Sequence, residues 1–271
     1  MQNPIEVSRT RYRADEDYIY AVDPVARFDQ RRLASMVGYV AIGLPIVLGI
    51  GGLMLGGLTH GGSPLGSFRA SISGFYYESV LLGDVMVGAL AFIGTLMLAY
   101  RGWSRKVADL ATGAGLAAYL VALFPAAGWF LVSGEDAIFV TASHILHAVA
   151  AGVLFLILAF FCFFVFTRVE VHQTEGEGVP ASVKRARDRI YRAAGTLILL
   201  SIAAIPLGGL LLEDRADTYR ITFWAETVAL TAFGISWLVQ GRASNTRLMD
   251  VRDRRDKAVA KGKEAAAEAK D

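Results

Sequence analysis

Between Ser143 and Thr167 the chain reads SHILHAVAAGVLFLILAFFCFFVFT, an apolar run long enough to cross the hydrocarbon core of a bilayer as a helix. It shows no alternation of polar and apolar residues, which argues against a β-strand. A bilayer core offers no water to backbone polar groups, so a helix is the spanning form open to such a run. Five other runs of this kind are Ala34–Leu55, Ser79–Tyr100, Leu110–Val132, Ala193–Leu212 and Ile221–Gln240. The sequence therefore predicts an all-α, polytopic membrane protein with six transmembrane helices.

The composition agrees with this prediction. A chain of 271 residues is long enough for one or two soluble domains, but 54% of its residues are hydrophobic and only 19% are charged. Mean hydropathy is +0.44. The single cysteine, Cys162, lies inside an apolar run, which excludes a disulfide framework and a cysteine-based metal site.

The basic residues predict the orientation. Of the 27 lysines and arginines, all but Arg69, Arg215 and Arg220 lie in the two terminal segments and in the second and fourth connecting loops. Basic residues accumulate on the cytoplasmic side of membrane proteins, so both termini are predicted to be cytoplasmic. The same asymmetry gives arginine a topological role and leaves no support for nucleic-acid binding.

Three regions follow from this arrangement. Residues 1–33 form a charged cytoplasmic arm without the pattern of a signal peptide, residues 34–241 form the six-helix domain, and residues 242–271 form a charged cytoplasmic tail. Residues 168–192 are predicted to be a cytoplasmic linker that ends in the basic run Lys184–Arg192. Such basic stretches either contact anionic lipids or only set the topology.

Small residues and prolines suggest how the helices pack. Gly52 and Gly56 form a small-xxx-small step, which suits close packing within the bundle or a homodimer face. The oligomeric state stays open. Pro45, Pro125 and Pro206 are predicted to bend or open the first, third and fifth helices.

Four ionisable residues fall inside the predicted spans: Asp84, His144, His147 and Glu226. Burial of such a group costs at least ~2.5 kcal/mol on insertion scales, which marks these residues as functional candidates. All four lie roughly 9 Å or less below the outer ends of their helices, at 1.5 Å per residue. They could share one site that holds a polar head group, relays protons or binds a metal, or each could reach the interface alone. No recognised metal-ligand spacing occurs, so no metal is predicted.

The loop before the second span carries further candidates. Arg69, Ser73, Tyr76 and Tyr77 could meet a phosphate or sugar group at the membrane surface. The two tyrosines also suit an aromatic belt at the interface. Ser73 lacks a nucleophile elbow, which argues against a catalytic triad with His144 and Asp84.

Several short motifs carry a resemblance. They are Ser71-Ile-Ser-Gly-Phe-Tyr-Tyr, Asp84-Val-Met-Val-Gly, Ala122-Leu-Phe-Pro, Arg189-Ile-Tyr-Arg and Phe223-Trp-Ala-Glu-Thr. Together they resemble a group of uncharacterised bacterial six-helix membrane proteins and, more remotely, the DRAM/FRAG/SFK-type proteins. The resemblance implies a multi-pass protein of the bacterial cytoplasmic (inner) membrane and, loosely, the handling of lipids. It names no cofactor.

Three functions remain open from the sequence. The first is a protein that binds or modifies a lipid or polar head group in a pocket near the outer leaflet, with membrane lipids as partners. Its predicted catalytic residues are Asp84, His144 and Glu226, and its predicted binding residues are Arg69, Ser73, Tyr76, Tyr77 and His147. The alternatives are a small-solute or proton-coupled transporter and a non-catalytic membrane assembly subunit.

Overall fold

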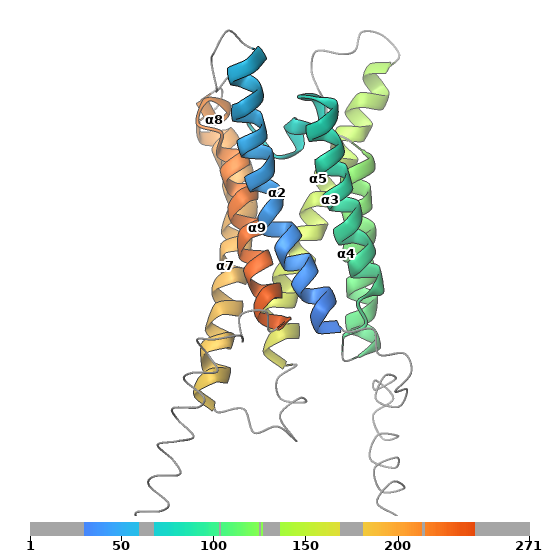
Figure 1. The fold of residues 1–271 in the computed structure, drawn as a ribbon, viewed down its shortest axis with the longest axis vertical. Coiled ribbons are helices and arrows are strands. Elements are labelled where there is room, and N and C mark those ends of the chain that lie inside the picture. Colours follow the sequence, from blue (N-terminus) through green and yellow to red (C-terminus); the bar gives the residue numbers. More distant parts are fainter. Residues whose placement is uncertain are drawn as a thin grey trace, which may run out of the picture.

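The computed structural model describes residues 30–59, 68–102, 104–124, 126, 136–168, 181–212 and 215–241. The predictions for the tail and for most of the N-terminal arm lie outside these residues. Every regular element in the described ranges is helical (Figure 1). In chain order they are α2 (Gln30–Thr59), the 3₁₀-helix η2 (Ser73–Tyr77), α3 (Val80–Ala99), α4 (Arg105–Leu123), α5 (Asp136–Phe160), the π-helical η3 (Phe161–Val165), α7 (Ala181–Leu212), α8 (Arg215–Thr218) and α9 (Ile221–Gln240).

The prediction of six membrane helices is confirmed at the level of length and composition, since six helices are long and apolar enough to cross a membrane. The third one differs from its predicted bounds, Leu110–Val132. It starts earlier, because the Ser104 side chain accepts a hydrogen bond from the Val107 N–H and caps the helix N-terminus. Its α-helix ends at Leu123, just ahead of the Phe124–Pro125 bond, as the restriction on residues preceding proline favours.

The predicted linker 168–192 is also partly helical, because α7 begins at Ala181 and runs without interruption through the basic run into the apolar span. Lysine and arginine are good helix formers, so charge alone does not stop a helix. Tertiary packing adds support, since the Tyr191 side chain within the basic run is only 1% exposed.

Successive long helices run in opposite directions (Figure 1), and the contacts between the six helices close them into a ring. Each packs against its neighbours along the chain, in the order α2, α3, α4, α5, α7 and α9, and α9 packs back against α2. Alternation places η2, α8 and the first residues of α3 and α9 at one end of the bundle, called here the η2 end. The opposite end, where α9 finishes, is called the Gln240 end.

Two pairs of glycines allow close approach of neighbouring helix backbones. A Cβ atom added at Gly38 of α2 would lie 2.7 Å from the Gly234 carbonyl oxygen of α9, and one added at Gly234 would lie 2.8 Å from the Gly38 oxygen. Gly94 of α3 and Gly115 of α4 meet in the same way, at 3.1 and 2.8 Å. Helices in a membrane associate through such close backbone packing.

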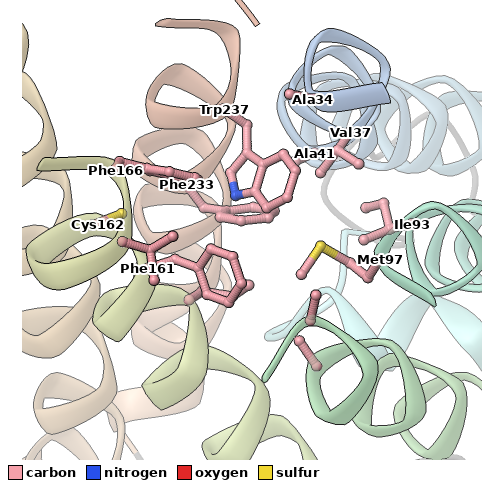
Figure 2. Close-up of a cluster of buried hydrophobic side chains, with 14 of the residues drawn as sticks. Ala34, Val37, Ala41, Ile93, Met97, Phe161, Cys162, Phe166, Phe233 and Trp237 are labelled. Carbon is pink, nitrogen blue, oxygen red and sulfur yellow. The ribbon is translucent and has the colours of Figure 1, made fainter. Parts of the chain in front are cut away.

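The core at the Gln240 end is aromatic (Figure 2). Trp237 of α9 is fully buried between Phe161 and Phe166 on one side and Val37 on the other. Its ring lies 5.9 Å from that of Phe161 and 5.4 Å from that of Phe166, centroid to centroid. The indole therefore joins α9 to η3 and to Phe166, the residue that follows it.

Candidate functional site

Residues 68–79, which lead into α3, carry several polar side chains at the η2 end. Phe68–Ile72 runs alongside the first two turns of α9. Three hydrogen bonds join them, listed from the start of the segment: Arg220 Nε to the Phe68 carbonyl (3.3 Å), the Phe223 N–H to the Ala70 carbonyl (2.8 Å) and the Ile72 N–H to Glu226 Oε2 (2.6 Å). Every second residue of the segment thus meets every third residue of the helix.

These bonds complete the termini of two helices. The first N–H groups of an α-helix have no partner within the helix. Arg220, at the N-cap of α9, makes no side-chain cap and has a φ of 53°, so the Ala70 carbonyl accepts from the Phe223 N–H in place of a capping side chain. Glu226 in turn accepts from Ile72, the N-cap residue of η2. Each element therefore supplies the partner that the other lacks.

Apolar side chains hold the same segment inside the bundle. Phe75 is fully buried and Ile72 is 5% exposed. The Phe68 ring packs edge-on against that of Phe223, with centroids 4.7 Å apart. On the other side the segment presses against α3, because a Cβ atom added at Gly83 would lie 2.7 Å from the Tyr76 carbonyl oxygen. The segment is part of the packed bundle on both flanks.

Two arginines are anchored on this segment. Arg69 forms an ion pair with Glu78, whose side chain is only 4% exposed while that of Arg69 is 41% exposed. The Arg220 guanidinium lies over the Phe68 ring, 5.2 Å from its centroid. Two of the three basic residues that the sequence places on the outer side therefore converge on neighbouring positions of one segment.

Two serine hydroxyl groups follow Arg69 in the chain, at Ser71 and Ser73. The Ser71 and Ser73 oxygens are 3.2 Å apart, and Ser71 also accepts a hydrogen bond from the Gly74 N–H at 3.0 Å. Ser73 is 9% exposed. The rings of Tyr76 and Tyr77 pack against each other with centroids 4.9 Å apart, and both side chains are half-buried. The predicted binding residues Arg69, Ser73, Tyr76 and Tyr77 thus lie on one short segment.

Of the four ionisable residues in the spans, Glu226 and His147 face other parts of the bundle, whereas Asp84 and His144 are exposed on its surface. Glu226 contacts the segment, and His147 of α5 is 6% exposed, with Nδ1 2.7 Å from the Phe124 carbonyl oxygen at the end of α4. Asp84 of α3 and His144 of α5 are exposed on their helices, and α4 lies between α3 and α5 in the ring. The structure brings Glu226 to the segment that carries Arg69 and Ser73. It does not gather Asp84, His144 and Glu226 into one constellation, so their predicted catalytic roles stay predictions.

Metal ligands do not cluster in the part of the chain that the structure describes, where no group of three or more histidine, cysteine, aspartate or glutamate side chains could hold an ion.

The hydrogen-bond partners of Glu226 and His147 could not be predicted from residue types, because both partners are backbone groups. The Ile72 N–H that Glu226 binds carries no signal in the residue type. The Phe124 carbonyl has only a general signal: the last carbonyl groups of a helix lack partners within the helix, and a proline at position 125 predicts that α4 ends there.

Comparison of the chain with protein-family models, with curated proteins and with solved structures finds no match.

Proposed function

We propose that the protein binds the polar head group of a membrane lipid, through its phosphate, at the η2 end. The observation that carries this proposal is the anchoring of Arg69 and Arg220 on neighbouring residues of one packed segment. A guanidinium group offers a rigid fork of donors that matches a phosphate, and an arginine already held in place loses less conformational freedom on binding.

The membrane setting of the proposal follows from charge. With 24 of 27 basic residues on the side of the two termini, the η2 end faces outward and the bound head group belongs to the outer leaflet. The resemblance to bacterial six-helix membrane proteins and to the DRAM/FRAG/SFK-type proteins supports a lipid ligand and a bacterial inner membrane by analogy.

Binding fits the geometry better than catalysis does. Glu226 already accepts a short hydrogen bond from Ile72, and Asp84 and His144 are exposed on other helices. A general acid or base must reach the reacting atoms together with its partner groups. Ser71 and Ser73 instead supply hydroxyl groups, on the same segment as Arg69, that can bond to phosphate or glycerol oxygens.

The test is a lipid titration of the purified full-length protein followed by native mass spectrometry, with phosphatidylglycerol and phosphatidylcholine as probes. We expect Arg69→Gln to weaken retention of phosphatidylglycerol about tenfold, on the scale of one charge-assisted hydrogen bond. Arg215→Gln, the same change on the exposed helix α8 at the same end, serves as the control and should behave as wild type. Equal retention by all three proteins would refute the proposal.

A further inference from the structure

Helix α7 differs from the other membrane helices in its exposure. In its most apolar window only 22% of residues are buried, against 44–50% in the other five. Most of this window is therefore exposed on the outside of the bundle. The helix also projects beyond its apolar part, since the helix begins at Ala181 and the apolar run at Ala193.

Three arginines line the exposed face of this projecting part. Arg185, Arg189 and Arg192 are all exposed, and their spacing of four and three residues places them on one face of the helix. The opposite face is packed, because Tyr191 is 1% exposed and its ring lies 5.3 Å from that of Phe166, the residue after η3. The backbone that carries the three arginines is thus held in place by packing against the bundle.

The arginine face continues directly into the lipid-facing surface of the span. Beyond Arg192, steps of three or four residues reach further positions on the same face of α7. These positions are exposed and mostly apolar: Thr196, Leu199, Ala203, Leu207 and Leu210. An acyl chain that lies along these positions has its head group at the level of the arginines. The hydroxyl-bearing Thr196 stands at the boundary between the two parts.

We infer that this face of α7 binds a phospholipid that carries two phosphates. The rise from Arg185 to Arg192 is about 10 Å, which one phosphate cannot span and two linked phosphates can. Three guanidinium groups complement two negative charges, and basic sites beside membrane helices suit such head groups. The inference concerns the Gln240 end and does not depend on the site proposed at the η2 end.

The experiment is a native mass spectrometry titration of the full-length protein with diphosphatidylglycerol in competition with phosphatidylglycerol. We expect wild type to prefer the lipid with two phosphates, and the triple change Arg185→Gln, Arg189→Gln and Arg192→Gln to weaken its binding on the order of 100-fold. The matched control is Arg101→Gln with Arg105→Gln and Lys106→Gln, which removes the same charge from exposed positions at the same end. Thermal unfolding shows whether each variant is folded.

Two further variants separate a defined site from general charge attraction and from misfolding. Replacement of Arg185, Arg189 and Arg192 by lysine keeps the charge and should retain most of the binding. Ala203→Trp keeps every charge but obstructs the path of the acyl chain, so it should weaken binding several-fold. The inference would be overturned if wild type bound diphosphatidylglycerol no better than phosphatidylglycerol. An equal loss of diphosphatidylglycerol binding in the charge-matched control would also overturn it. Loss of binding in Arg69→Gln alone would concern the η2 end only.

Discussion

The carboxylate of Glu226 accepts a hydrogen bond from the backbone N–H of Ile72 at 2.6 Å, although 154 positions separate the two residues. This bond fixes the start of η2 to the last helix of the ring, while the Ala70 carbonyl completes the start of α9. A carboxylate within a membrane span is a functional candidate by default. Here it has a defined structural partner, which explains its position without chemistry.

Replacement of Glu226 should therefore act on stability. We expect Glu226→Ala to lower the free energy of unfolding by about 1–3 kcal/mol, because it leaves a buried N–H without an acceptor. Glu226→Gln keeps a carbonyl oxygen at the same place and should remain within about 1 kcal/mol of wild type. Thermal unfolding in detergent measures both. A glutamine variant as unstable as the alanine variant would point to a role for the charge itself.

His147 should hold the end of α4 against α5. Its ring nitrogen lies 2.7 Å from the Phe124 carbonyl oxygen, so His147→Ala is expected to destabilise the protein by about 1–3 kcal/mol. His144→Ala is the matched control, since His144 is exposed one turn earlier on the same helix. The comparison is made by thermal unfolding, and equal effects of the two changes would contradict the assigned contact.

The glycine crossings give a prediction with an internal control. Gly38→Ala and Gly234→Ala each place a methyl group less than 3 Å from a backbone oxygen, so each should destabilise the protein by about 1–3 kcal/mol. Gly43→Ala lies on the same helix as Gly38, with no atom within 4 Å of the added carbon. It should be neutral or stabilise α2 by up to about 1 kcal/mol, through helix propensity. Should Gly43→Ala prove the most harmful, the packing of α2 on α9 is wrong.

Trp237 should contribute through packing alone. Its indole N–H has no hydrogen-bond partner among the described residues, while its ring contacts four others: Tyr100, Phe161, Phe166 and Phe233. We expect Trp237→Ala to cost about 3–5 kcal/mol and Trp237→Phe clearly less. Ile235→Ala, at a 43% exposed position of the same helix, is the control and should cost little. Unfolding midpoints of the three variants decide the order.

Sidedness can be measured with single cysteines. The charge distribution predicts that Thr218→Cys, on α8, reacts with a membrane-impermeant maleimide in intact cells and that Arg105→Cys, at the start of α4, reacts only after the membrane is opened. Cys162 is fully buried, so the unmodified protein reports the background. The reverse labelling pattern would place the η2 end in the cytoplasm.

The sequence was informative about elements and weak about their partners. Hydropathy located all six membrane helices, and the run of glycines in α2 pointed to close packing. It suggested Gly52 and Gly56, which are both buried in α2, and it did not point to the backbone contacts between Gly38 and Gly234 and between Gly94 and Gly115. The sequence did not predict that residues 181–192 are helical, because their charge resembles that of a solvated linker, while in the structure Tyr191 packs against Phe166.

By itself, the sequence determined that the chain forms six apolar helices, because a hydrocarbon environment leaves the backbone no other way to bond its polar groups. Only the tertiary structure decided that Glu226 bonds to Ile72, that His147 contacts Phe124 and that the Asp84 side chain is exposed on the surface of the bundle. Lipid is as apolar as the interior of the bundle, so helices that are apolar on every side carry little information about which face turns inward. That rotation is set by backbone contacts at glycines and by bonds to backbone groups, and residue types along one helix do not reveal either.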